Sequence, residues 1–333
     1  MKKLKGMFAV AGTTALALSL LAGCGASNSV SSTSKQGASK DHKIVIGFSQ
    51  VGAESGWRTA NTESIKSAAA ADSNIELKFS DAQQKQENQI KAIRSFIAQK
   101  VDVIAFSPVV QTGFEPVLKE AKAAGIPVIL TDRSVEADPS LYVTMIGSDF
   151  TQEGKKAADW MLNNIKSDGT VNIAELEGTV GSAPAVDRKK GFDEEIKDHQ
   201  NYKIIKSQSG DFTRSKGKEV MEAFLKSDGK KINVVFAHND DMALGAIQAI
   251  EEYGLNPGKD IKVISMDGIK DAFQAMVDGK LNASIECNPL LGPALMETAE
   301  GVLAGKKYPK WIKSEEGVFD QTNAAKELPN RKY

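Results

Sequence analysis

Cysteine and histidine are scarce in this chain, whose 333 residues include two cysteines and three histidines. No C-x-x-C or H-x-x-x-H spacing occurs, and three scattered histidines cannot build a convincing metal site, which needs clustered nitrogen and sulfur ligands. Cys24 and Cys287 have separate explanations, given below, so the sequence predicts neither a metal nor a disulfide. We therefore expect the fold to depend on its hydrophobic core.

Motifs for nucleotide binding and for nucleophilic catalysis are also missing. There is no G-x-G-x-x-G after the first predicted strand, no G-x-x-x-x-G-K-[ST] and no G-x-S-x-G. His238 follows a predicted strand, but the sequence nominates neither a nucleophile nor an orienting partner for it. We expect His238 to be packed or to lie at a pocket rim, and we expect no cofactor and no enzymatic activity.

Charge of one sign is not in excess, because 42 basic residues face 43 acidic ones and the formal net charge is −1. There is no basic stripe and no acidic tail, so we expect no nucleic-acid partner. Beyond the first residues, no apolar run approaches membrane-spanning length.

The first 42 residues read as a targeting segment. A basic start (Met1–Lys5) precedes an apolar core (Met7–Leu20), which is typical of a secretory signal. Leu21-Ala22-Gly23-Cys24 resembles a bacterial lipobox and predicts a signal peptide over 1–23 and a lipid anchor at Cys24. A plain secretory signal with a chance cysteine stays the alternative. Residues 24–42 are rich in Ser, Gly and Ala and predict a flexible tether.

In the rest of the chain, short Val- and Ile-rich runs alternate with helical stretches about every 25 to 30 residues, the size of a βα unit. The predicted strands are 44–48, 75–79, 101–106, 126–130, 142–146, 171–176, 203–207, 232–237, 261–266 and 283–286. The predicted helices are 60–71, 85–99, 114–124, 152–165, 186–197, 215–226, 242–253, 271–277 and 290–303. The pattern restarts after the fifth strand, which predicts an α/β fold with two doubly wound parallel-sheet lobes. After residue 303 we expect a short polar segment.

Ligands of doubly wound sheets bind outside the carboxyl ends of the strands. The loop after the first strand carries a carboxylate (Glu54), a large ring (Trp57) and a planar cation (Arg58) within five residues. An aromatic face can cover the C–H surface of a sugar while charged groups bind its hydroxyls. This loop alone could also be a surface loop with a packed Trp.

Other strand ends carry the same kinds of side chain. The candidate residues are Asp132, Arg133, Arg188, Asp211, Phe212, Asn239 and Asp267. Taken together with the first loop they form an inventory suited to a neutral, hydroxyl-rich ligand.

Each of these residues also has a structural alternative. The Asp132–Arg133 pair could be a local ion pair, Asp211 could cap the next helix, and Asp267 could be a turn residue before Gly268. In the segment 239–241 we expect an aspartate rather than Asn239 to cap the following helix.

Several of these motifs carry a family resemblance. Thr131-Asp132-Arg133, Met266-Asp267-Gly268 and the run Ala237–Ala246 are similar to those of type I periplasmic sugar-binding proteins, which supply ABC transporters. The stretches Glu54–Arg58 and Gln208–Lys218 fit the same family. The resemblance covers most of the chain from about Lys43 onward.

The resemblance implies two Rossmann-like lobes joined by a three-strand hinge, comprising 43–147 plus 288–314 and 148–287 plus 315–333. It implies a monomer that holds one monosaccharide and presents it to an ABC permease. Its implied ligand contacts are Glu54, Trp57, Arg58, Asp132, Arg133, Arg188, Asp211, Phe212, Asn239, Asp267 and Glu286.

Galactofuranose is the leading ligand, with ribose, arabinose and galactopyranose as alternatives. Ribose binders carry Gln at what looks like the Cys287 position, which argues against plain ribose. Cys287 itself is expected to be a small buried hydrophobe. A sugar-sensing repressor core would share the fold but would need a DNA-binding helix-turn-helix before Lys43, where a signal peptide stands instead.

Overall fold

A computed structural model describes residues 43–333. The predicted signal peptide 1–23, the tether 24–42 and the lipidation site Cys24 lie outside the described residues. Within residues 43–333, no helix has both the length and the apolar character needed to cross a bilayer.

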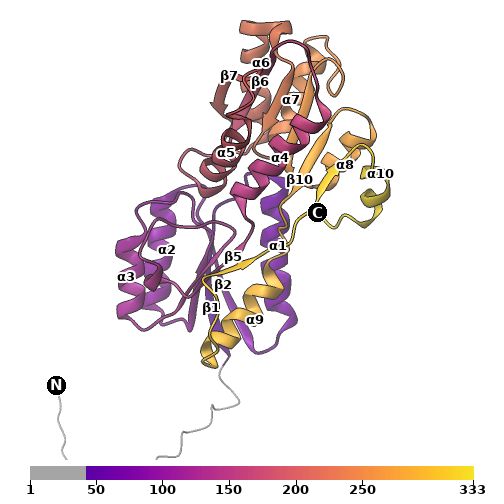
Figure 1. Ribbon diagram of the computed structural model, residues 1–333. Helices are drawn as coiled ribbons and strands as arrows, with labels where there is room; N and C mark the ends of the chain where they lie inside the picture. The colour runs from indigo at the N-terminus through magenta and orange to yellow at the C-terminus, as the bar shows by residue number, and fades with distance from the viewer. Residues whose placement is uncertain (1–42) are drawn as a thin grey trace, which may run out of the picture. The chain divides into compact units, whose positions relative to one another are not determined.

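The described chain forms two six-stranded sheets (Figure 1). Every pairing in the first sheet is parallel, and in the second only the edge strand β12 runs antiparallel to its neighbour. In spatial order the first sheet contains β11 (Trp311–Lys313), β5 (Thr144–Gly147), β4 (Val128–Thr131), β3 (Val103–Phe106), β1 (Ile44–Gln50) and β2 (Ile75–Asp81). The second contains β12 (Val318–Asp320), β10 (Ala283–Glu286), β9 (Lys262–Asp267), β8 (Val234–Ala237), β6 (Val171–Glu177) and β7 (Tyr202–Ser209).

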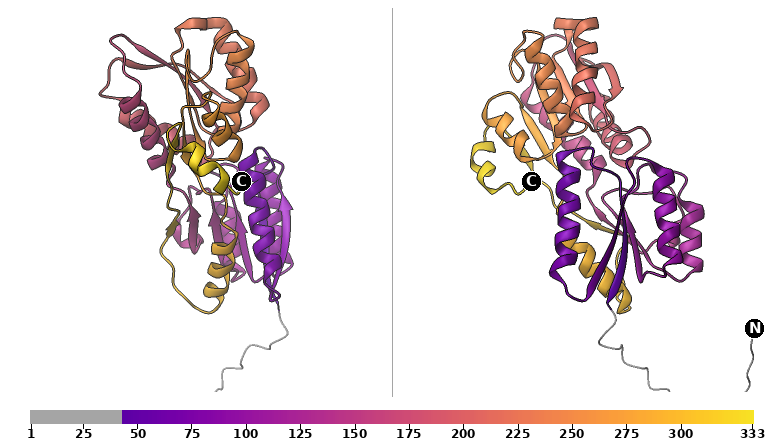
Figure 2. Two further views of the ribbon diagram at one scale, coloured as in Figure 1. Left: turned by 90° about the vertical axis from the view of Figure 1, so that its right-hand side faces the viewer. Right: turned by 180° about the vertical axis from the view of Figure 1, so that it is seen from behind.

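Helices cover both faces of each sheet. Successive side chains of a strand point to opposite faces, and because the central strands are apolar on both faces, each face must be buried. The first sheet packs with α1 (Gly56–Ala71), α2 (Gln86–Ala98), α3 (Glu115–Ala123) and α9 (Gly292–Leu303). In β3, Ile104 and Phe106 pack with α2 and α3, whereas Val103 and Ala105 face α1 and α9. Figure 2 shows these two helix pairs on opposite sides of the strands.

The second sheet is covered in the same way. Its helices are α4 (Phe150–Asn164), α5 (Ala183–Ile196), α6 (Arg214–Asp228), α7 (Asp240–Glu252), α8 (Lys270–Val277) and the short α10 (Ala324–Glu327). Val234 and Phe236 of β8 pack with α4 and α5, whereas Val235 and Ala237 pack with α6 and α7. Short 3₁₀ turns occupy Pro139–Leu141, Gly229–Lys231 and Leu328–Asn330.

The chain passes between the sheets three times (Figure 1). It leaves the first sheet after β5, returns after β10 through residues 287–291, and leaves again between β11 and β12 through residues 314–317. The predicted fold class, two parallel-sheet α/β lobes, is confirmed. The residue boundaries of the lobes stay a prediction.

The segment after residue 303 departs from expectation. It contributes an edge strand to each sheet, and β12 pairs antiparallel with β10, where a polar segment was predicted. Each strand is three residues long, which is too short to show an alternating pattern in the sequence.

Close packing of α4 on α5 depends on glycine. A Cβ added to Gly154 would lie 2.1 Å from the carbonyl oxygen of Arg188, and one added to Gly191 would lie 2.0 Å from that of Thr151. Both contacts are with backbone, which cannot rotate away. The two glycines therefore let the helices approach closely enough to bring Glu153 of α4 against Arg188 of α5.

Replacing Gly154 by Ala should separate these helices and lower the free energy of unfolding by about 1–3 kcal/mol, the usual cost of overpacking. Urea unfolding measures the effect. The control is Gly169→Ala, because the nearest atom to a Cβ there is 3.9 Å away. Equal stability of the two variants would contradict this account.

Candidate functional site

A cavity lies where the carboxyl ends of both sets of strands converge. Its lining combines charged, aromatic and amide groups. The lining residues are Glu54, Ser55, Trp57, Arg58, Asp132, Arg133, Pro184, Arg188, Phe212, Asn239, Asp267 and Cys287.

Nine of the eleven residues predicted to contact a ligand line this cavity, and Asp211 and Glu286 do not. Asp211 is exposed and accepts a hydrogen bond from Ser209 Oγ. It does not cap α6, because Thr213 does. The carboxylate of Glu286 faces Arg331, with Arg331 Nη1 2.8 Å from Glu286 Oε1.

Two arginines of the first lobe share two carboxylates. Arg58 Nε lies 2.9 Å from Glu54 Oε1, and its Nη2 lies 2.7 Å from Asp132 Oδ2. Arg133 is held less tightly, since its contacts with the same two carboxylates are both 3.6 Å long. Its Nη1 donates to the carbonyl of Val109 at 3.1 Å. All four charged side chains are almost completely buried.

The two arginines respond to burial in opposite ways. Burial lowers the pKa of Arg133 to about 10, and repulsion from Arg58 adds to this effect. Burial also acts to lower the pKa of Arg58, but Asp132 and Glu54 outweigh it and the pKa rises. Arg133 is thus the cation in the cavity with the weakest compensation. Two polar atoms here, Glu54 Oε2 and Arg133 Nε, have no hydrogen-bond partner among the described residues.

The second lobe contributes Arg188. Its Nε lies 2.6 Å from Glu153 Oε2, its Nη1 donates to the carbonyl of His238, and its Nη2 lies 3.6 Å from Asp267 Oδ1. Burial raises the pKa of Asp267 well above the ordinary carboxyl range, although Arg188 acts in the opposite direction. Glu153 was not predicted, because it sits on a helix rather than at a strand end.

Two aromatic rings complete the lining. Trp57 Nε1 donates to the carbonyl of Cys287 at 2.6 Å, so the indole is fixed to the second crossover. The ring of Phe212 lies 5.3 Å from the Arg133 guanidinium, within cation–π range. Gly178 leaves room for this ring, because a Cβ there would lie 1.9 Å from Phe212.

Backbone strain gathers at the same place. Asp132, Phe212 and Asp267 have φ values of 63°, 61° and 114°, which are unfavourable for residues with a side chain. Strain of this kind persists where the surrounding structure enforces it, commonly at functional sites. It was not visible in the sequence, where aspartates near glycines read as ordinary turns.

Asn239 and not an aspartate caps α7, which corrects the expectation. Its Oδ1 accepts from Met242 N at 3.0 Å, while its Nδ2 donates to the carbonyl of Phe212 at 3.1 Å. Asp240 and Asp241 are occupied elsewhere, Asp240 at Gly268 N and Asp241 at Gly56 N. His238 is fully buried against Phe236, and it is not among the residues that line the cavity.

Comparison with known proteins agrees with this geometry. A family model for the periplasmic binding protein domain matches residues 46–307. The chain belongs to the periplasmic binding protein family. Members of this family bind solutes outside the cytoplasm and are not enzymes.

Three similar proteins have names that mention sugars. The galactofuranose-binding protein YtfQ of Escherichia coli K12 is 53% identical over 87% of this chain and 92% of its own length. A Mycobacterium smegmatis protein solved with β-D-fucofuranose is 57% identical, with a TM-score of 0.84 and coverage of 87% and 95%. The binding protein of the Shewanella sp. ANA-3 arabinose ABC transporter, solved with α- and β-L-arabinofuranose, is 52% identical, with a TM-score of 0.83 and coverage of 86% and 95%.

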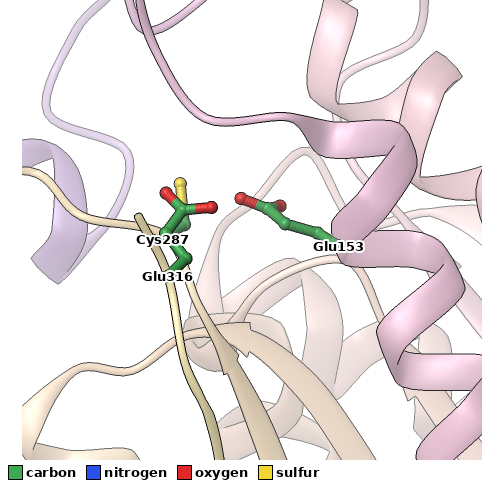
Figure 3. Close-up of side chains that lie close together, drawn as sticks. All are labelled: Glu153, Cys287 and Glu316. Atoms are coloured by element: carbon green, nitrogen blue, oxygen red, sulfur yellow. The ribbon is translucent and has the colours of Figure 1, made fainter. Parts of the chain in front are cut away.

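In this periplasmic binding protein, an acidic cluster lies beside the cavity at the crossovers. Figure 3 shows Glu153, Cys287 and Glu316 directed toward one another, with their potential ligand atoms within 4.8 Å. Glu316 Oε1 accepts from Ser148 Oγ and from Asn288 N, so one carboxyl group joins all three crossovers. Glu153 Oε1 has no hydrogen-bond partner among the described residues.

Among the described residues these three groups could hold a metal ion, but two of them, Glu316 and Cys287, have pKa values shifted toward the protonated form. Burial and then the charge of Glu153 raise the pKa of Glu316 to about 8, and burial also raises the pKa of the Cys287 thiol.

The raised pKa makes stability depend on pH. Between 4.5, the ordinary pKa, and about 8, the folded protein holds a proton on Glu316 that the unfolded chain releases. Stability therefore falls as pH rises through this window, by at most about 1.4 kcal/mol per pH unit from this group. Glu316→Gln should flatten that decline in urea unfolding at about pH 5.5 and about pH 8.

The neighbouring exposed residue gives the control. Glu315→Gln should keep the wild-type slope, because Glu315 lies outside the cluster. Identical slopes for Glu316→Gln and wild type would show that Glu316 is ionised throughout this range.

Proposed function

We propose that this protein captures one neutral monosaccharide in its furanose form, with galactofuranose as the leading candidate, and delivers it to an ABC importer. The single observation that carries the proposal is the cavity itself, in which two arginines and two carboxylates of the first lobe share contacts. A phosphate or carboxylate ligand would meet Glu54 and Asp132, whereas uncharged hydroxyls meet donors and acceptors of both kinds.

The unsatisfied atoms support a polar ligand. Glu54 Oε2 can accept a hydrogen bond from one hydroxyl, and Arg133 Nε can donate one to another. A ligand that supplies both removes two desolvation penalties. Trp57 and Phe212 offer apolar surface for the C–H groups of the ring.

The furanose form is favoured by the similar proteins, whose names mention galactofuranose, β-D-fucofuranose and L-arabinofuranose. Ribose, arabinose and galactopyranose are the competing ligands. A panel containing each of them, tested by thermal shift, decides between ring forms. At a concentration ~100 times its dissociation constant, the correct sugar should add roughly 2.7 kcal/mol of stability.

The capture mechanism follows from the three crossovers. We propose lobes comprising 43–147 plus 288–314 and 148–287 plus 315–333, which turn about the crossovers and close on the sugar as a monomer. Closure brings Arg133 of one lobe and Arg188 of the other to opposite parts of the same ligand. The closed form then presents both lobes to a permease.

Arg133→Ala should weaken sugar binding at least about 100-fold, because it removes the buried cation with the weakest compensation and leaves Glu54 short of a partner. Isothermal titration calorimetry with the best sugar of the panel measures the loss. Arg94→Ala is the matched control, since Arg94 pairs with Glu120 on the surface with more than half of its side chain exposed. Wild-type affinity in Arg133→Ala would refute the site.

We also propose that Cys24 carries a lipid that anchors the protein to the outer face of the cell membrane. The lipobox-like sequence Leu21-Ala22-Gly23-Cys24 supports this proposal. Cys24→Ser should move the protein from the membrane fraction to the soluble fraction after cell fractionation, while Cys287→Ser should leave it with the membranes. A Cys24→Ser protein that still pelleted with membranes would contradict the anchor.

A further inference from the structure

The turn Asp267–Ile269 places the Asp267 carboxyl group in the cavity. Asp267 has a φ of 114°, which residues with a side chain rarely adopt, and Gly268 has a φ of 76°, which glycine adopts without strain. The N–H groups of Gly268 and Ile269 donate to Asp240 Oδ2 at 2.7 and 2.9 Å. One side of the turn is thereby fixed by a buried carboxylate.

The other side of the turn is held by Arg331, which lies far from it in sequence. Arg331 Nε and Nη2 both donate to the carbonyl of Gly268, at 3.0 and 2.7 Å. The guanidinium lies within 4.6–5.2 Å of the rings of Phe273, Phe319 and Tyr333, which shield it from water. A Cβ on Gly268 would lie 2.9 Å from Arg331 Nη2, so the glycine is needed for this approach.

Glu286 orients the arginine. Its Oε1 lies 2.8 Å from Arg331 Nη1, and its Oε2 accepts from Gly317 N at 3.1 Å. Glu286 also pairs with Asp267 across β10 and β9. The carboxylate predicted to contact ligand thus lies next to Asp267 in the sheet but does not line the cavity.

We propose that Arg331, held by Glu286, is a positioning residue for ligand binding, because it fixes the turn that aims Asp267 at the sugar. This inference rests on the proposed function. Arg331 makes no contact with the cavity, and it acts on affinity only through Asp267. The fork of two N–H groups on one carbonyl cannot be reproduced by lysine.

Two substitutions separate the effect of the Arg331–Glu286 ion pair from that of the two hydrogen bonds to the Gly268 carbonyl. Arg331→Lys keeps a positive charge beside Glu286 but loses the pair of hydrogen bonds to the Gly268 carbonyl. Arg331→Gln loses both the charge and the pair of hydrogen bonds. Each should weaken sugar binding about tenfold, as expected for one well-placed hydrogen-bonded contact to a charged group. Lys332→Gln, an exposed neighbour, is the control and should stay within about twofold of wild type.

A double-mutant cycle with Asp267→Asn tests whether Arg331 affects sugar affinity through Asp267. If Arg331 acts through Asp267, then Arg331→Lys should cost less than about twofold further affinity in the Asp267→Asn background. A full additional tenfold loss there would show that Arg331 supports the fold in general, and would overturn the proposal.

Amide hydrogen exchange supplies a readout that needs no sugar. The amides of Gly268 and Ile269 should exchange faster in Arg331→Lys, while those of the distant strand β3 should not change. Wild-type exchange at both amides would overturn the proposal even if no sugar of the panel bound. Failure of the wild type to bind any sugar, with faster exchange in the variant, would refute the proposed function and keep the role of Arg331 in the turn.

Discussion

The buried guanidinium groups of Arg58, Arg133 and Arg188 impose the main constraint on this structure, because an ionised group removed from water must find compensating charge and hydrogen bonds. Arg58 has two close carboxylates, and Arg188 has Glu153. Arg133 has only longer contacts with carboxylates, and burial together with repulsion from Arg58 lowers its pKa. The cavity therefore holds both cations and carboxylates, but some of its buried polar atoms lack hydrogen-bond partners among the described residues. A neutral polar ligand stabilises such a site by supplying the missing hydrogen bonds.

Much of this arrangement follows from the sequence because parallel sheets collect their strand ends at one edge. Asp132 and Asn239 follow β4 and β8 closely, and Glu54 and Trp57 lie in the β1–α1 turn and at the start of α1, so a correct strand assignment was enough to bring them together. Glu153 and Arg331 could not be found in this way. Glu153 reaches the site from a helix, and Arg331 acts from residues that carry no periodic pattern.

The cavity presents Cys287 and not its neighbour Glu286, which the family resemblance nominated as a ligand contact. Cys287 directly follows the last residue of β10, and the Glu286 carboxylate pairs with Arg331 instead. This pairing could not be predicted from the sequence, because Glu286 and Arg331 lie 45 positions apart and neither belongs to a motif that names the other.

Two hydrogen bonds between the lobes bear on the proposed closure. Gly56 N donates to Asp241 Oδ2 at 2.7 Å, and Gln111 N donates to the carbonyl of Gly181 at 2.9 Å. Each such bond contributes only about 1 kcal/mol net, so these two cannot by themselves hold the closed form strongly. A ligand shifts the equilibrium only by its differential affinity for the two forms. In the proposed closure the sugar contacts groups of both lobes and so supplies that difference, and without the sugar the equilibrium depends on the hinge, where Glu316 joins the three crossovers.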